Sequence, residues 1–165
     1  MRCIYETFRR FSCLLPLIAL CVSPLNGNTT KAAISDTEMQ VWEAYTFQIE
    51  DSKTRVNLAS VKLTVSKLVP IDGYLVGRYQ IDVPLMSSKN DRGRIVLPLD
   101  MTVAKLRKAG GVLVGKAYSE VGTRKVNQIV CEISAFEKKA IKLEITTSER
   151  TLHFDSKYTM SKAGS

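Results

Sequence analysis

Residues 124–160 read RKVNQIVCEISAFEKKAIKLEITTSERTLHFDSKYTM, and three consecutive runs in this stretch alternate apolar and polar residues. Successive side chains of a β-strand point to opposite faces of the sheet, so a period of two predicts strands with one buried and one exposed face. Short polar breaks separate the three runs. The stretch therefore predicts a three-stranded antiparallel meander, and the rest of the chain is interpreted around it.

One register satisfies both faces of the first hairpin. With its turn centred on Glu137, the facing pairs are Ile133 with Ile141, Cys131 with Leu143, Ile129 with Ile145 and, on the polar face, Glu132 with Lys142. With Ser148-Glu149 as the loop of the second hairpin, the pairs are Ile145 with Leu152, Leu143 with Phe154, Lys142 with Asp155 and Glu144 with His153. Neither turn contains the Asn-Gly or Asp-Gly that two-residue hairpins favour, so a slip to a four-residue loop stays open for the second.

The N-terminus has the pattern of an export signal. Three arginines precede an apolar run, Cys13 to Val22. This run suits a signal-peptide core and is well short of the roughly 20 residues that a membrane-spanning helix needs. We expect residues 1–27 to be a cleaved signal peptide, with cleavage after Gly27 slightly preferred to cleavage after Cys21. The mature protein is then periplasmic or secreted and has no transmembrane segment.

The cysteines follow from this cleavage. Cys3, Cys13 and Cys21 leave with the signal peptide, so Cys131 is alone in the mature chain and cannot form an internal disulfide. The alternation places Cys131 on the apolar face of its strand. We therefore interpret it as a small buried apolar residue rather than a nucleophile.

The remaining pattern predicts an all-β fold. Strands are expected at Glu38–Ile49, Val56–Leu68, Tyr74–Leu85, Arg94–Leu99 and Val112–Ser119, followed by the meander. A loop is expected at Ser87–Gly93, and a bulge or close packing contact at Gly77. One helix is expected at Asp100–Ala109, capped by Asp100 and ended by Gly110-Gly111.

About eight short strands with one helix indicate an antiparallel β-sandwich, with a closed β-barrel as the alternative. We expect residues 28–36 to be a flexible lead-in, 37–160 a single β domain and 161–165 a frayed tail.

The formal net charge of +8 at pH 7 is concentrated in the middle of the chain. Between Arg78 and Lys125 there are ten basic residues and four acidic ones. A basic surface attracts anionic partners over about a Debye length, roughly 8 Å. The binding residues expected on this basis are Lys89, Arg92, Arg94, Arg107 and Lys108.

The sequence contains little that indicates a catalytic site or a metal site. His153 is the only histidine, which excludes a site with several histidine ligands. His153 and Asp155 share a strand face and resemble an oriented base, but no serine has the setting of a nucleophile, and Glu144 gives His153 an ordinary cross-strand partner. No phosphate-binding loop, zinc-finger spacing or calcium-loop spacing is present, so we expect no catalytic residue, metal or cofactor.

These observations favour an exported, non-enzymatic β domain that binds a cell-envelope or extracellular partner. The partner would be an envelope protein or an anionic glycan or lipid headgroup, held by an exposed edge strand or by the basic middle loops. Nucleic acid is not expected, because the protein is exported and its basic residues lack interleaved aromatics. The alternatives are a carrier of a small, lipid-like ligand in an apolar cavity and a hydrolase that uses His153.

Overall fold

The computed structural model describes residues 34–84, 86–122 and 125–162. The predicted signal peptide and three of the four cysteines lie outside these residues. In chain order the described elements are α1 (Asp36–Glu43), β1 (Tyr45–Ile49), β2 (Ser52–Val56), β3 (Ala59–Val65), β4 (Val69–Ile71), β5 (Tyr74–Asp82), the 3-10 helix η1 (Ser87–Lys89), β6 (Asp91–Pro98), α2 (Val103–Ala109), β7 (Gly111–Ser119), β8 (Val126–Ile133), β9 (Ala140–Thr146) and β10 (Thr151–Lys162).

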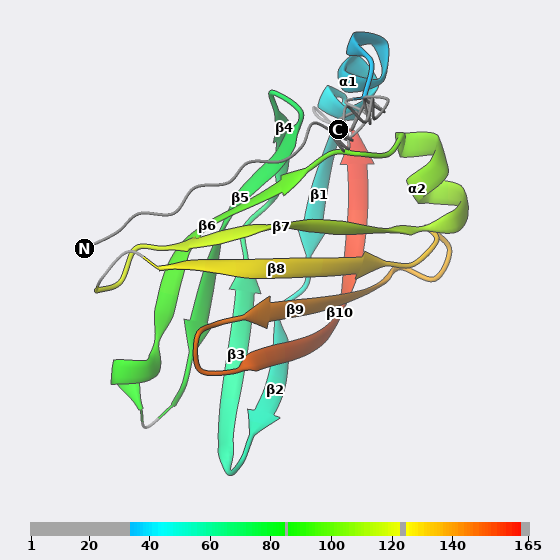
Figure 1. Cartoon of the computed structure of the whole chain (residues 1–165). Coiled ribbons are helices and arrows are strands. Elements are labelled where there is room, and N and C mark those ends of the chain that lie inside the picture. Colours follow the sequence, from blue (N-terminus) through cyan, green and yellow to red (C-terminus); the bar gives the residue numbers. More distant parts are fainter. Residues whose placement is uncertain (1–33, 85, 123–124, 163–165) are drawn as a thin grey trace, which may run out of the picture.

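The strands form one antiparallel sheet in the order β1-β10-β9-β8-β7-β6-β5-β3-β2, with β4 paired to β5. The sheet curls into a half-barrel, and the two helices lie at one end of it (Figure 1). The predicted all-β fold is confirmed. About eight strands are expected from the sequence, whereas the described chain has ten. The short strands β2 and β4 are too brief to give a clear periodic signal.

Both hairpins of the meander have the predicted register. Ile133 faces Ile141 in the first hairpin, and Leu143 faces Phe154 in the second. The second turn has no Asn-Gly pair and is held by hydrogen bonds of Thr147. The backbone N–H of Thr147 donates to the carbonyl oxygen of Arg150 (2.9 Å), and the Oγ1 of Thr147 accepts from the N–H of Arg150 (3.1 Å). A threonine hydroxyl can fix a turn in this way without glycine.

A bulge interrupts the strand that pairs with β5. Val65 faces Tyr79 in β3, while Val69 faces Val76 in β4, so the segment between them holds one more residue than the facing part of β5. Gly77 lies opposite the bulge, and a Cβ added there would come within 2.4 Å of Leu68 Cδ2. The predicted bulge or close contact at Gly77 is therefore confirmed.

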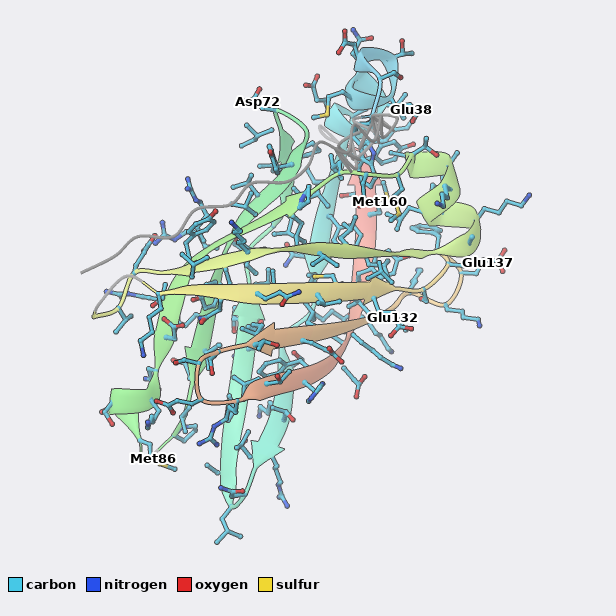
Figure 2. All side chains as sticks on the ribbon, viewed as in Figure 1. Glu38, Asp72, Met86, Glu132, Glu137 and Met160 are labelled. Carbon is cyan, nitrogen blue, oxygen red and sulfur yellow. The ribbon has the colours of Figure 1, made fainter. Side chains whose placement is uncertain are left out.

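The bulge turns the backbone of Leu68 away from β5 and towards β1. The N–H of Phe47 donates to the carbonyl oxygen of Leu68 (3.0 Å), and the N–H of Leu68 donates to that of Phe47 (2.7 Å). These bonds join the first strand of the sheet to the connection between β3 and β4. The inner side chains are buried, and Phe47 stacks on Tyr158 with ring centroids 4.7 Å apart. Figure 2 shows side chains filling the space inside the curled sheet.

The predicted strand over Glu38–Ile49 is wrong in its first half. Residues 36–43 form α1, and Ser35 caps this helix by accepting a hydrogen bond from the N–H of Glu38 (3.4 Å). Trp42 then packs into the core with 1% of its surface exposed, and its indole N–H donates to the carbonyl oxygen of Met101 (2.9 Å). This tertiary contact favours the helix over the weak alternation that predicts a strand.

The boundaries of three further elements differ from the predictions. Thr102 caps α2, because its Oγ1 accepts from the N–H of Lys105 (3.0 Å), so the predicted cap at Asp100 is wrong. The helix stops at Gly110 as expected, with a positive φ of 75°. Strand β6 begins at Asp91, inside the predicted loop, and β5 ends at Asp82.

Cys131 is a buried apolar residue, as the alternation predicts. Its side chain has no exposed surface, and it is the free cysteine of the described residues. Burial raises the pKa of the thiol to about 12. The thiol therefore stays protonated and unreactive in the folded protein.

We predict that Gly77→Ala destabilises the fold by about 1–3 kcal/mol, the usual range for overpacking a tight site. The new methyl group would meet Leu68 Cδ2. Urea unfolding of Gly77→Ala, Leu68→Ala and the double variant measures the coupling between the two sites. Strictly additive losses would contradict the proposed contact.

We predict that Cys131 makes the stability of the protein fall at alkaline pH. The unfolded thiol loses its proton near its ordinary pKa of 9.0, while the folded thiol keeps its proton up to about 12. Between these values the unfolded state binds fewer protons, so the free energy of unfolding decreases as pH rises. Urea unfolding between pH 8 and 10.5, compared with Cys131→Ala, checks this: the variant should show a shallower decline, and parallel pH profiles would reject the assignment.

Candidate functional site

The five basic residues expected to bind a partner come from three elements, β6, α2 and η1. Arg92 and Arg94 lie on the exposed face of β6, Arg107 and Lys108 lie in the last turn of α2, and Lys89 ends η1. The structure therefore brings together Arg92 and Arg94, and separately Arg107 and Lys108.

Two of these residues have nearby structural partners. Lys89 forms an ion pair with Glu149 in the turn between β9 and β10 (3.3 Å). The guanidinium of Arg107 lies over the ring of Phe136, 5.1 Å from its centroid, and the backbone N–H of Phe136 donates to the carbonyl oxygen of Arg107 (3.0 Å). Glu137, labelled beside α2 in Figure 2, belongs to the same turn. These contacts explain Lys89 and Arg107 as links between adjacent segments.

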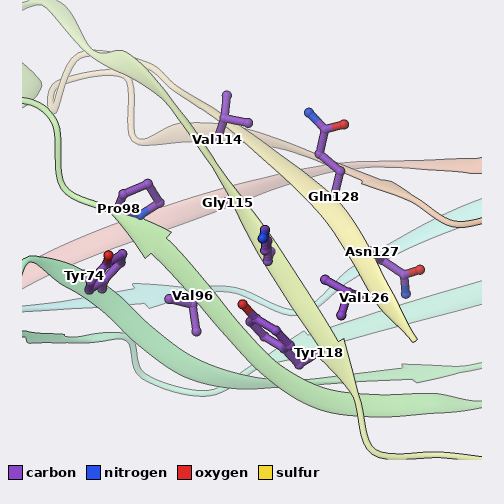
Figure 3. A pocket seen from close by; sticks show the side chains of 10 residues that line it. Tyr74, Val96, Pro98, Val114, Gly115, Tyr118, Val126, Asn127 and Gln128 are labelled. Atoms are coloured by element: carbon purple, nitrogen blue, oxygen red, sulfur yellow. The ribbon is translucent and has the colours of Figure 1, made fainter. Parts of the chain in front are cut away.

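An open groove on the outer face of the sheet lies next to Arg94, whose cross-strand partner Tyr118 is one of its lining residues. The groove has a volume of about 580 Å³. We call it the outer groove, and Figure 3 shows the side chains along it. Its lining residues come from β5, β6, β7 and β8: Tyr74, Val96, Pro98, Val114, Gly115, Lys116, Tyr118, Val126, Asn127 and Gln128.

The outer groove lies where β6 and β7 separate. Their paired register runs from Gly93 opposite Ser119 to Val96 opposite Lys116. At Gly115 the two backbones still touch, since a Cβ there would lie 2.2 Å from the carbonyl oxygen of Val96. Only glycine permits this approach, and beyond it the strands diverge towards α2 (Figures 1 and 3).

The floor of the outer groove is unusually apolar for the outer face of a sheet. Val114 is 43% exposed, Tyr74 44% and Val126 57%. Val112, on the same face of β7, is 49% exposed. Contiguous exposed apolar side chains on a sheet face are typical of interaction surfaces.

Basic side chains stand beside this apolar floor. Arg94 faces Tyr118 across the β6–β7 ladder, and its guanidinium lies 5.7 Å from the centroid of that ring. Lys116 lines the groove and is exposed. Arg78, opposite Arg94 on β5, is neutralised by an ion pair with Glu120. Arg94 and Lys116 therefore place positive charge beside the groove.

The basic pattern of the sequence indicated Arg92 and Arg94, but it missed the apolar part of the site. The signal lies in β7, where Val112 and Val114 alternate with the buried Leu113, so both faces of the strand are apolar. Such a run is typical of a strand that is covered on both sides.

His153 has the environment expected of a polar ladder. Its Nδ1 lies 3.2 Å from Glu144 Oε1, and both side chains are exposed. Within the described ranges, no cluster of three or more His, Cys, Asp or Glu side chains could hold a metal ion.

A buried polar cluster lies between β5, β6 and β7, at the end of the ladder where β6 and β7 stay paired. The hydroxyl of Tyr79 donates to Asp91 Oδ2 (2.8 Å), and the hydroxyl of Ser119 donates to Asp91 Oδ1 (2.5 Å). Burial, reinforced by the bond to Asp91, raises the pKa of Tyr79. The cluster satisfies two buried hydroxyls and fixes β6 between its neighbours.

No family model, curated protein or solved structure matches this chain. None of the helices in the described part of the chain is long and apolar enough to cross a membrane.

We predict that Asp91→Ala destabilises the protein by about 1–3 kcal/mol, because it leaves the hydroxyl of Tyr79 buried without its acceptor and leaves that of Ser119 only the longer bond to the carbonyl oxygen of Val121 (3.4 Å). Adding Tyr79→Phe removes one stranded hydroxyl and should recover part of the loss. Thermal unfolding of both variants checks this, and no recovery in the double variant would argue against the bond.

Proposed function

We propose that the protein is an exported, non-enzymatic β domain that binds an anionic partner of the cell envelope or extracellular space through the outer groove. The observation that carries this proposal is the apolar floor between β6 and β8 with Arg94 and Lys116 beside it. Export is supported by the basic and apolar pattern of the first 27 residues.

The chemistry of the outer groove suits recognition better than catalysis. Tyrosine and arginine are the residues that most often dominate binding energy at interfaces, and Arg94 and Tyr118 form such a pair here. Exposed cations attract an anionic partner, and the apolar floor adds affinity after contact. No comparable supporting geometry surrounds His153 in the described residues, so the hydrolase alternative gains no support.

We infer that the sheet closes into a barrel rather than forming a sandwich. The pairing of Phe47 with Leu68 continues the register in which Ser52 faces Leu63, which supports a continuous ladder between the β1–β2 segment and β3. The interior holds large, fully buried side chains, among them Trp42, Phe47, Phe154 and Tyr158. This packing favours a ligand site on the outer surface over the enclosed cavity of a carrier.

Retention on a heparin column tests the proposal with a defined polyanion. We predict that the purified Arg94→Glu/Lys116→Glu variant elutes at a clearly lower salt concentration than the wild type, because two attractive charges at the groove become repulsive.

The matched control is Lys53→Glu/Arg55→Glu, which makes the same charge change at exposed positions of β2. It should elute close to the wild type. Equal shifts for both variants would show that retention follows net charge, and would overturn the assignment to the outer groove.

A further inference from the structure

Part of one edge of β7 lies outside the register that joins β7 to β6 in the described residues. In an antiparallel ladder, the backbone N–H and C=O groups of alternate residues point to the same neighbouring strand. The N–H of Glu120 donates to the carbonyl oxygen of Arg92 at the start of β6 (2.8 Å). Residues of the same parity, including Val112 and Val114, therefore direct their backbone groups to the β6 side.

Strand β6 does not complete this edge. Within the described residues, its register with β7 ends at Val96 opposite Lys116. The next residue of β6 that would face β7 is Pro98, which has no N–H to donate. The N–H of Leu99 bonds to the carbonyl oxygen of Gly73 (2.8 Å), which continues the ladder with β5 on the other side of β6. Val112 and Val114 therefore lie outside the register between β6 and β7 in the described residues, and the carbonyl oxygen of Val114 has no N–H of Pro98 to accept from.

This part of the edge coincides with the outer groove. Val96 and Pro98 line the groove from β6, and Val114 lines it from β7. An extended peptide placed between these walls would bond to the backbone of β7 and place alternate side chains on the apolar floor. Its other end would lie near Lys116 and Arg94.

We propose that the anionic partner is a protein that inserts an extended acidic segment as an added strand along Val112–Val114 of β7. This inference rests on the proposed function and specifies the class of partner. The charge of the groove favours an acidic segment, and it disfavours a second copy of this chain, which would bring the same basic residues together.

The inference is tested with peptides of random sequence, 12 residues long, selected on the purified protein from a displayed library. We expect the selected peptides to be acidic and free of proline. Two synthetic versions of a selected peptide are methylated at backbone nitrogens, one at the odd positions and one at the even positions. One of the two should bind at least ten-fold more weakly than the unmethylated parent peptide. Hydrogen exchange at Val112 and Val114 should slow when the parent peptide binds.

The following results would contradict the addition of a strand to β7. Equal binding by the parent and both methylated peptides, or unchanged exchange at Val112 and Val114, would overturn it, as would selected peptides that are basic or neutral. If no peptide is selected while heparin retention still depends on Arg94 and Lys116, this inference fails and the proposed function stands. If heparin retention is also unaffected, both fail.

Discussion

The fold depends on the backbone pairing of Phe47 with Leu68. This pairing requires the bulge at the β3–β4 connection, and the bulge requires the absence of a side chain at Gly77. The first strand is held there and by β10 on its other side, and Phe47 and Tyr158 stack in the core between these two attachments. A core is obtained without an internal disulfide among the described residues, in which Cys131 is a free thiol.

Because the inner side chains are buried, the outer face is the surface of the sheet that a partner can reach. The outer face differs along the sheet: β8, β9 and β10 carry facing charges such as Glu132 with Lys142 and Glu144 with His153. Across β6 and β7 the outward residues change to valine and tyrosine, beside Arg94 and Lys116. Charged ladders keep a sheet face solvated, whereas the apolar section favours contact with another molecule.

Much of the meander follows from its sequence, because a period of two has one register that buries Ile133, Ile141 and Leu143 together. The bulge is also predictable, because Gly77 interrupts the apolar face of its strand. The helix α1 could not be predicted in this way, because Trp42 owes its place to a bond with Met101, far away in the sequence. The basic side of the site was visible in the composition. The groove was not, because it arises from the divergence of β6 and β7 beyond Gly115, which only the tertiary arrangement determines.

The binding surface that we propose is the apolar and basic section of β6, β7 and β8. Backbone amide NMR spectra recorded while a heparin tetrasaccharide is added test it most directly. We predict that the largest shifts occur at residues around Arg94, Lys116 and Tyr118, with small changes in the last turn of α2. Shifts centred on Arg107 and Lys108, or spread evenly over all exposed basic residues, would contradict it.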